Sequence, residues 1–432
     1  MNNKMFTIIL MSLVVFSIFI LGCDNKVSYD NLAPYEGQPT DDSQATAEGV
    51  AQVVIGNNEF ALEMYEQLNQ ANSASTKNIF FSPYSISSAL AMAYEGANGE
   101  TEEEMRNVLH LPEDYNLLRS SFAKLNNVFN EEEKEYKLNV ANAFWAQHDY
   151  SFLPDYLNVI GRYYGGTNAN LDFVNENKKS VKEINDWVED NTNNKIKNII
   201  SSLDSQTRLV LTNAIYFKGK WKYEFDKSDT KDMFFKTPNG QKEVDMMYLN
   251  EDEFKFNYME NDEIQVLEMP YQGEELSMLV FLPKVDETGI FDASVVEEYF
   301  DPVKLVEVKN SMSKEHVIIY FPRFTFETKY GLNDHLIQLG MTKAFTWPGA
   351  DFSGLDGTTD LYISNVLHKA FVEVNEKGTE AAAATAVSFK VTSAMPAPQT
   401  IFKADHPFVF MIQEKSTGSI LFMGKMNDPL AE

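Results

Sequence analysis

The chain has 432 residues, of which 36 are lysine or arginine and 64 are aspartate or glutamate, so its formal net charge is −28. With 44% hydrophobic and 13% aromatic residues it can bury a substantial core, which excludes wholesale disorder. The negative charge argues against nucleic-acid binding, because phosphate contacts require clustered lysine and arginine. Length alone favours two or three domains.

The first segment of the chain has the pattern of an export signal. Lys4 is followed by an uncharged, mostly apolar run of 17 residues (5–21), then by Gly22 and the sole cysteine, Cys23. A basic start, an apolar core and a small residue at the junction predict a signal peptide over residues 1–22. The alternative is an uncleaved membrane anchor, because 17 residues reach the lower limit for a spanning helix. One cysteine excludes an intrachain disulfide and paired-cysteine metal or redox sites.

A polar stretch separates this signal from the rest of the chain. Residues 24–48 contain two prolines and one glycine and show no hydrophobic periodicity. This composition is typical of a flexible linker, so we predict a tether over residues 23–48. No second linker, repeat or low-complexity segment interrupts the remaining sequence. The continuity predicts one large folded domain, residues 49–432, in place of the two or three that length suggests.

Helical signals dominate the first part of this domain. Ser82 is a favourable N-cap residue and is followed by Pro83 at the first helical position. Thr101 and Glu104 have the spacing of a capping box and predict a short helix that ends near Leu109. Apolar residues at helical spacing and further caps indicate the others. In chain order, we expect helices over residues 50–68, 83–95, 101–109, 114–129, 154–164 and 177–190.

Strand signals dominate the second part. Residues 209–217 are nearly all apolar, which is typical of a strand buried on both faces. Residues 238–240, Pro-Asn-Gly, are a hairpin signal. Among the strands we expect a helix over residues 330–339, which is ended by Gly340. We expect strands over residues 209–217, 233–236, 242–248, 253–258, 264–269, 276–282, 316–326, 361–374, 401–403, 407–412 and 419–424. Helices first and strands later predict an α+β domain with large antiparallel sheets.

Catalytic signatures are absent from the sequence. It contains no GxSxG elbow, HExxH motif, P-loop, GxGxxG motif or EF-hand loop. The histidines are widely separated and lack metal-ligand spacing. We therefore expect no enzyme activity, no metal and no cofactor. The six histidines are His110, His148, His316, His335, His368 and His406.

One stretch near the C-terminal end has two incompatible readings. Four consecutive alanines at 381–384 favour the start of a short helix. Read with a period of two, the same stretch predicts a strand with one buried face. Its small and apolar face comprises Thr379, Ala381, Ala383, Thr385, Val387, Phe389 and Val391. The opposite face, which carries the charges, comprises Glu380, Ala382, Ala384, Ala386, Ser388 and Lys390.

The flanks of this stretch indicate an exposed loop. Gly378 precedes it, and Pro396 and Pro398 follow it, and two prolines so close together do not fit a sheet interior. A loop that also carries the pattern of a strand has two possible locations. Its small leading residues would let it enter a sheet without displacing a packed core. We therefore predict a conformational switch here.

These residues resemble a known family, the serpins. The resemblance covers roughly residues 50–429 and lies in motifs of the family in the right order. They are Asn-Ile-Phe-Phe-Ser-Pro-Tyr-Ser-Ile (78–86), Thr-Asn-Ala-Ile-Tyr-Phe-Lys-Gly-Lys-Trp (212–221), the strand 361–376 with His-Lys-Ala (368–370), the hinge 376–386, Asp-His-Pro-Phe-Val-Phe (405–410) and Leu-Phe-Met-Gly-Lys (421–425). The resemblance implies one α+β domain of about nine helices and three sheets with an exposed reactive-centre loop.

The resemblance also implies a function. Serpins are suicide inhibitors of serine proteases, and some trap cysteine proteases. The protease forms an acyl-enzyme with the loop, and the cleaved loop then inserts into the central sheet and distorts the attached protease. The small hinge residues favour an inhibitor, and the alternative is a non-inhibitory serpin that acts as a surface binding protein.

The resemblance assigns individual residues to this process. It places a polar cluster where the central sheet parts, the shutter, and an aromatic residue, Trp221, where the loop first enters, the breach. The shutter residues are Ser82, Ser85, Asn213 and His368. The hinge residues are Glu376, Gly378, Thr379, Glu380, Ala381, Ala382, Ala383, Ala384, Thr385 and Ala386.

The scissile bond follows from the family's usual spacing after Glu376, which indicates Thr392–Ser393. Lys390, Val391 and Ala394 remain alternatives. Lys390 would suit a trypsin-like protease, whereas Val391 or Ala394 would suit elastase- or subtilisin-like enzymes. A valine before the scissile residue would also suit papain-like cysteine proteases. We expect a protease that prefers small or aliphatic residues.

The N-terminal signal carries a second resemblance. Residues 20–23, Ile-Leu-Gly-Cys, resemble a bacterial lipobox, in which the cysteine is lipidated and becomes the new N-terminus. The resemblance implies a lipid on Cys23 and attachment to a membrane of the bacterial cell envelope. We expect a monomer whose partners are proteases and this membrane, not nucleic acid.

Overall fold

Most of the longer helices lie in the first part of the chain and most of the strands in the second, as the sequence predicts. Helix α2 (Pro83–Tyr94) begins at the expected N-cap Ser82, and Asp114 caps α4 (Tyr115–Phe129). The computed structural model describes residues 39–72, 76–131, 134–286, 291–379 and 399–431, all within one compact unit. Within these ranges the other helices are α1 (Ala47–Ala71), α3 (Gly99–Val108), α5 (Pro154–Val159), continued by a π-helical turn at Ile160–Tyr164, α6 (Asn177–Asn191), α7 (Pro302–Ser311), α8 (Asn333–Leu339) and α9 (Ser353–Asp356).

The strands of the described residues form three sheets, which confirms the predicted α+β fold. A seven-stranded sheet has the order β1 (Ile79–Phe81), β17 (Ile420–Met426), β16 (Phe408–Glu414), β9 (Leu276–Pro283), β8 (Ile264–Pro270), β7 (Phe256–Glu260) and β10 (Ser313–Glu315). A four-stranded sheet has the order β15 (Thr400–Lys403), β11 (Val317–Pro322), β6 (Gly240–Leu249) and β5 (Lys231–Thr237). The third, called the central sheet, has the order β12 (Phe324–Gly331), β13 (Ile363–Asn375), β14 (Gly378–Thr379), β4 (Leu209–Lys220), β2 (Tyr136–Gln147) and β3 (Thr167–Leu171).

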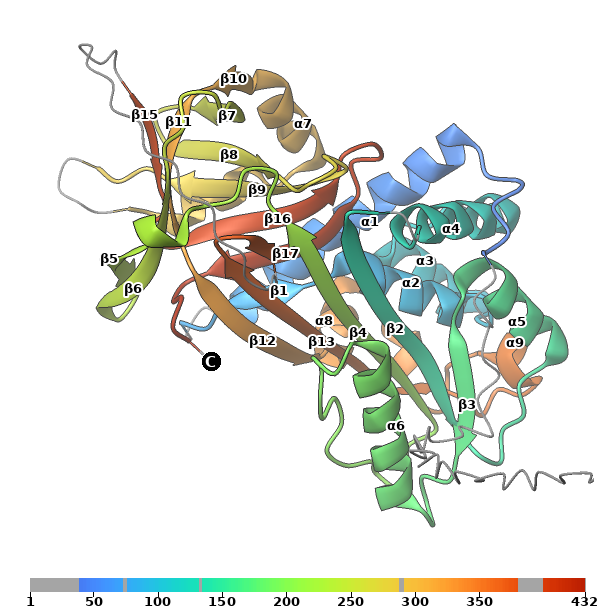
Figure 1. Cartoon of the computed structure of the whole chain (residues 1–432). Helices are drawn as coiled ribbons and strands as arrows, with labels where there is room; N and C mark the ends of the chain where they lie inside the picture. Colours follow the sequence, from blue (N-terminus) through green and yellow to red (C-terminus); the bar gives the residue numbers. More distant parts are fainter. Residues whose placement is uncertain (1–38, 73–75, 132–133, 287–290, 380–398, 432) are drawn as a thin grey trace, which may run out of the picture. The chain divides into compact units, whose positions relative to one another are not determined.

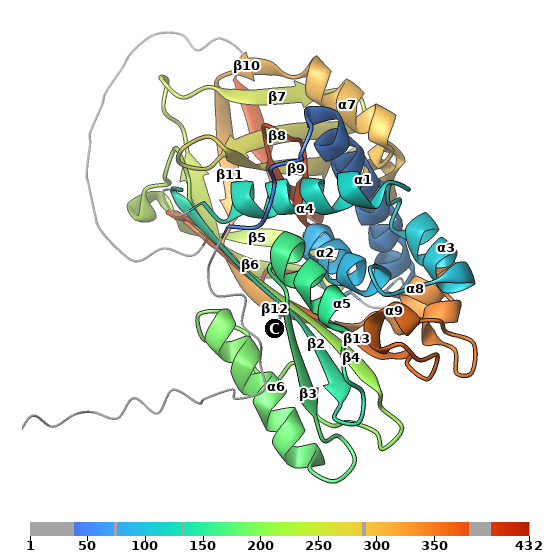
Figure 2. The same ribbon diagram turned by 90° about the vertical axis from the view of Figure 1, so that its right-hand side faces the viewer.

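The central sheet has helices on both faces. Its long strands β2, β4, β13 and β12 run side by side, and α6 crosses one face (Figure 1). The turned view places α6 on one side of these strands and α2, α4 and α5 on the other (Figure 2). Helix α2 packs against β2, β4 and β17, and all of its residues are buried. It therefore joins the central sheet to the seven-stranded sheet.

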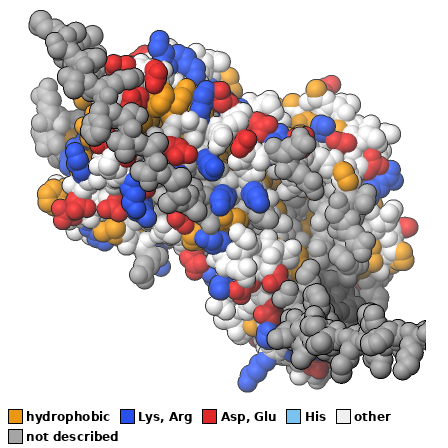
Figure 3. Space-filling view, in the orientation of Figure 1, with side chains coloured by type: hydrophobic (Ala, Val, Ile, Leu, Met, Phe, Trp, Pro, Cys, Tyr) orange, Lys and Arg blue, Asp and Glu red, His pale blue; other side chains and the backbone are white. Residues whose placement is uncertain are grey.

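The surface carries charges of both signs. On the face in Figure 3, acidic and basic side chains are interspersed among uncharged ones. This face therefore shows no large patch of a single charge sign among its described residues.

Two local predictions are wrong. Thr101 does not cap α3, because it lies inside the helix, which starts at Gly99, and its hydroxyl accepts the N–H of Asp351. Glu104 instead accepts two backbone N–H groups from the segment before α9. The single strand expected over residues 316–326 is two strands, β11 and β12, which lie in different sheets. Contacts with residues far away in the sequence determine both outcomes, and the spacing of neighbouring residues does not reveal such contacts.

Residues 39–48 do not behave as the predicted tether. Thr40 is buried and exchanges hydrogen bonds with Asn127 of α4, its N–H donating over 3.0 Å and its carbonyl accepting over 2.8 Å. Asp41 pairs with Arg162 of the π-helical turn. Helix α1 then begins at Ala47, two residues before the expected domain boundary. The prediction of a flexible tether therefore does not hold for this part.

The rest of the predicted N-terminal segment, including Cys23, lies outside the described residues. In the described ranges, no helix combines the length and the apolar composition that crossing a membrane requires.

Candidate functional site

The first two residues of the hinge form a strand of the central sheet. This strand, β14, lies between β4 and β13 and is antiparallel to both. Beyond its end, β13 and β4 pair directly and in parallel, starting at the pair Phe371–Tyr216. Gly378 and Thr379 therefore occupy the position of an inserted strand, while the remaining length of β4 and β13 is closed. We call the space between β4 and β13 the slot.

Gly378 has to be glycine at this place. Its φ is +143°, and an added Cβ would lie 2.1 Å from the carbonyl oxygen of Gly219 on β4. The residue before it is held as well, because the Trp221 N–H donates to the Lys377 carbonyl over 2.8 Å. The backbone thus enters the slot at one defined point.

Glu376 starts the hinge and is buried. Its carboxylate accepts a hydrogen bond of 2.9 Å from the Thr230 hydroxyl, and its carbonyl accepts the Phe225 N–H over 2.8 Å. Both partners lie on the segment that follows β4. These bonds fix the hinge at its beginning. The sequence gives no local signal for Thr230.

Trp221 and Tyr271 form a stacked aromatic pair beside β14. Their ring centroids are 4.6 Å apart at an interplanar angle of 14°, and the Trp221 indole N–H donates to the Asn375 carbonyl over 3.0 Å. The Tyr271 hydroxyl lies 2.8 Å from the hydroxyl of Thr379. Burial raises the pKa of Tyr271 well above its ordinary value, so the phenol stays neutral. Trp221 therefore lies beside β14, where the slot begins, and Tyr271, which has no local signal in the sequence, lies with it.

The predicted shutter residues converge at the closed part of the slot, where β4 and β13 pair directly. His368 on β13 lies opposite Asn213 on β4, and the His368 Nδ1–H donates to the Asn213 side-chain oxygen. Its Nε2 accepts the Ser82 N–H over 3.2 Å. The Asn213 amide donates to the Ser85 hydroxyl and to Asn142 of β2. Neither β2 nor a role for Asn142 is predicted from the sequence. Asparagine is depleted in strands, so the asparagines of β2 obscure its strand pattern.

This cluster fixes the protonation state of His368. The ring is fully buried, and this desolvation lowers its pKa from 6.5 to about 3. The neutral ring therefore has one N–H donor and one acceptor nitrogen, which match Asn213 and Ser82. Because His368 and Asn213 lie on the two strands that border the slot, a strand that enters there has to break their hydrogen bond.

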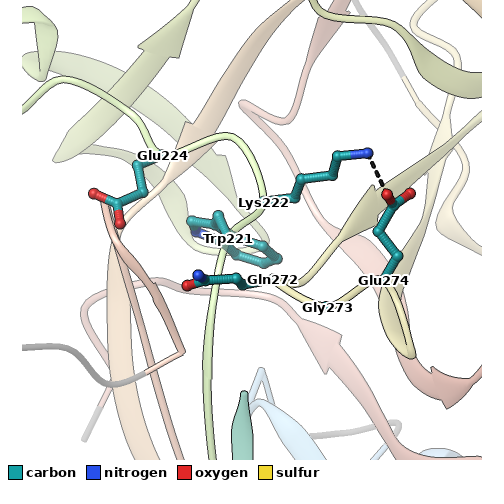
Figure 4. A pocket seen from close by; sticks show the side chains of 6 residues that line it. All are labelled: Trp221, Lys222, Glu224, Gln272, Gly273 and Glu274. Atoms are coloured by element: carbon teal, nitrogen blue, oxygen red, sulfur yellow. Dashed lines mark ion pairs between the residues drawn. The ribbon is translucent and has the colours of Figure 1, made fainter. Parts of the chain in front are cut away.

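A pocket of about 370 Å³ adjoins Trp221 on the surface (Figure 4). Lys222, which follows Trp221, forms an ion pair of 2.6 Å with Glu274 in the turn between β8 and β9. The pair ties the end of β4 to the turn that carries Tyr271. The pocket is lined by Trp221, Lys222, Glu224, Gln272, Gly273 and Glu274.

The chain on either side of the predicted scissile bond ends in two different sheets. Thr379 ends β14 in the central sheet, and Thr400 begins β15, which pairs in parallel with β11 in the four-stranded sheet. Residues 380–398 between them lie outside the described residues. They include the hinge residues from Glu380 to Ala386 and the candidate scissile positions Lys390, Val391, Thr392, Ser393 and Ala394.

Comparisons with known proteins agree with this architecture. A family model described as serpin (serine protease inhibitor) matches residues 55–429. A serpin-like protein of Thermococcus kodakarensis is 41% identical over 428 residues, which cover 96% of this chain and 97% of the relative. Leukocyte elastase inhibitor A of Mus musculus is 41% identical over 383 residues, 88% of this chain and 100% of the relative. The crystal structure of human thyroxine-binding globulin with thyroxine matches with a TM-score of 0.79 at 31% identity, covering 89% of this chain and 100% of that one. The chain belongs to the serpin family.

Proposed function

We propose that this serpin is a suicide-type inhibitor that traps serine proteases, and also papain-like cysteine proteases, as acyl-enzymes. Serpins as a family are generally inhibitors and not catalysts. The observation that carries the proposal is β14, in which Gly378 and Thr379 already lie between β4 and β13 in the antiparallel sense. Further hinge residues would lengthen this strand as β4 and β13, which pair directly beyond it, separate.

The topology explains why cleavage would trigger the change. Thr379 and Thr400 are held in different sheets, so the intact segment between them is restrained at both ends. When the protease nucleophile attacks a carbonyl in this segment, the peptide bond breaks, the residue on the β14 side becomes the acyl-enzyme, and the amine that leaves stays with the β15 side. The hinge is then free to continue into the slot, with the protease still attached through its acyl bond.

Continuing the register of β14 predicts where the inserted strand would end. Thr379 pairs with Gly219 on β4, and the strands are antiparallel. Ten residues further along the loop, Phe389 would therefore face Leu209, ten residues back along β4 and at its first residue. Ten residues of strand span roughly 33 Å. A protease attached at Thr392 would be carried past the opposite end of the sheet.

The side chains of the loop suit this path. Thr379 is buried with its hydroxyl toward Tyr271, so every second residue after it would face the same interior side. These positions are the small and apolar face of the loop. Burying Val387, Phe389 and Val391 would contribute about 1.5–3 kcal/mol each, and each ladder hydrogen bond a net of about 0.5–1.5 kcal/mol.

A mixture with a panel of proteases should produce a covalent complex that survives boiling in detergent. The panel comprises elastase, subtilisin, trypsin and papain, because Thr392–Ser393 and its alternatives Lys390, Val391 and Ala394 suit different members. A denaturing gel detects the complex, and the mass of the released C-terminal fragment identifies the bond, which should lie between Lys390 and Met395. Catalytically inactive protease is the control and should give no complex.

The alternative function is a non-inhibitory surface binding protein. One structural neighbour, thyroxine-binding globulin, is named for a ligand that it binds. This alternative predicts cleavage in the loop without a covalent complex and without a gain in thermal stability afterwards. That result would contradict inhibition by this chain.

The membrane attachment is part of the same proposal and rests on the lipobox-like residues 20–23. Expressed in a bacterium and labelled with radioactive palmitate, the full chain should incorporate label and sediment with the envelope fraction. Cys23→Ser should lose the label and leave the envelope fraction. Equal labelling of both forms would exclude a lipid on Cys23.

A further inference from the structure

The hydroxyl of Thr379 has a buried partner. Thr379 is 1% exposed, and its hydroxyl lies 2.8 Å from that of Tyr271, which is fully buried. Water does not reach either group. A buried hydroxyl without a partner destabilises the arrangement that buries it. The Tyr271 hydroxyl is therefore the partner that satisfies the buried Thr379 hydroxyl.

Tyr271 itself is held rigidly. Its ring stacks on Trp221 and meets the ring of Phe217 edge-on, at a centroid distance of 5.1 Å and an angle of 84°. Its N–H donates to the Leu276 carbonyl over 3.0 Å. The turn that carries it is fixed by ion pairs of 2.6 Å, Lys222–Glu274 and Lys134–Glu275. The phenol oxygen is therefore held at a fixed place beside β14.

We propose that Tyr271 is a positioning residue that keeps Thr379 docked in the central sheet of the intact protein. The resting molecule then already contains the nucleus of the inserted strand. The consequence for protease trapping rests on the proposed function. Insertion competes with hydrolysis of the acyl-enzyme, so a docked hinge gives more trapped protease and less cleaved, released inhibitor.

The chemistry of the pair predicts a specific pattern of mutational effects. Tyr271→Phe leaves the Thr379 hydroxyl buried without a partner, and Thr379→Val leaves the Tyr271 hydroxyl in the same state. Valine keeps the shape of threonine and favours strands. Removing both hydroxyls eliminates both unsatisfied groups, so the double variant should dock better than either single one. A merely structural role of Tyr271 would not give this rescue.

Hydrogen–deuterium exchange of the full chain tests the docking without any protease. In the wild type the backbone amides of Gly378 and Thr379 should exchange slowly. Each single variant should raise their exchange roughly tenfold, and the double variant should return it toward the wild-type rate. Tyr248→Phe, which removes a phenol hydroxyl on β6, is the matched control and should leave these amides unchanged.

The same four proteins, mixed with a protease that the wild type traps, give the second measurement. The ratio of cleaved to complexed inhibitor should rise severalfold in the single variants and fall again in the double variant. Equal hinge exchange in all four proteins would overturn the role of Tyr271, whatever the inhibition assays show. If exchange follows the predicted pattern but the wild type traps no protease, the docking role stands and the proposed function fails.

Discussion

Thr379→Arg should give a protein that proteases cleave but that traps none of them. Thr379 is enclosed between β4 and β13 and faces the buried Tyr271. An arginine at this position would have to take its charge out of water with no acidic partner provided, at a cost of several kcal/mol. The hinge would remain outside the sheet, so hydrolysis of the acyl-enzyme would win. On a denaturing gel, the ratio of cleaved product to covalent complex should rise at least about tenfold.

Thr325→Arg is the matched control for this experiment. Thr325 lies on β12, an edge strand of the same sheet, and its side chain is exposed. The same change of residue type there should leave the covalent complex intact. The cleaved Thr379→Arg protein should also lack the gain in thermal stability that insertion gives. Normal inhibition by Thr379→Arg would mean that strand insertion is not how this protein acts.

Acidification from about pH 6.5 to pH 4 should destabilise the protein more steeply when His368 is present than when glutamine replaces it. The pKa of buried His368 is lowered from 6.5 to about 3, so in this range the unfolded chain binds a proton that the folded protein does not. The stability that depends on the neutral ring is complete above pH 6.5 and is lost as the pH falls. The limiting slope is about 1.4 kcal/mol per pH unit.

Urea unfolding at half-unit pH steps measures this slope. At pH 7, His368→Gln should cost about 1–3 kcal/mol, because Asn213 and the Ser82 N–H lose their partner. Its slope between pH 6.5 and pH 4 should nevertheless be shallower than that of the wild type. Thr325→Gln, at an exposed position without a titratable group, is the control and should keep the wild-type slope. Equal slopes for the wild type and His368→Gln would contradict a neutral ring at the shutter.

Much of the fold could be predicted because its signals are local. Ser82 and Pro83 mark the start of α2 through a cap and a fixed backbone angle. The Pro-Asn-Gly turn at 238–240 joins β5 and β6 as expected. The period of two predicts a strand that starts at Thr379. The structure contains the beginning of such a strand, β14, which ends at Thr379. The described residues stop there, so the rest of the pattern stays a prediction.

The parts that were missed depend on distant partners. Tyr271 lies 108 positions from Thr379 along the chain, and nothing in the turn between β8 and β9 indicates the contact. Thr101 and Glu104 fit a capping box by spacing, yet both bond to segments more than 200 positions away. Only the folded chain brings such groups together, so spacing alone assigned them to the wrong partners.

The contacts of residues 39–46 determine which elements a mechanical force on the N-terminus would reach first. Asp41 is paired with Arg162, and Asp42 with Lys124 at 3.0 Å, before the chain enters α1. Tension applied through the N-terminus is therefore borne first by the π-helical turn and α4. Under the proposed lipid attachment, tension would act on these elements before it reaches β4, β13 and the hinge, so the central sheet would keep its strand order while the chain is pulled.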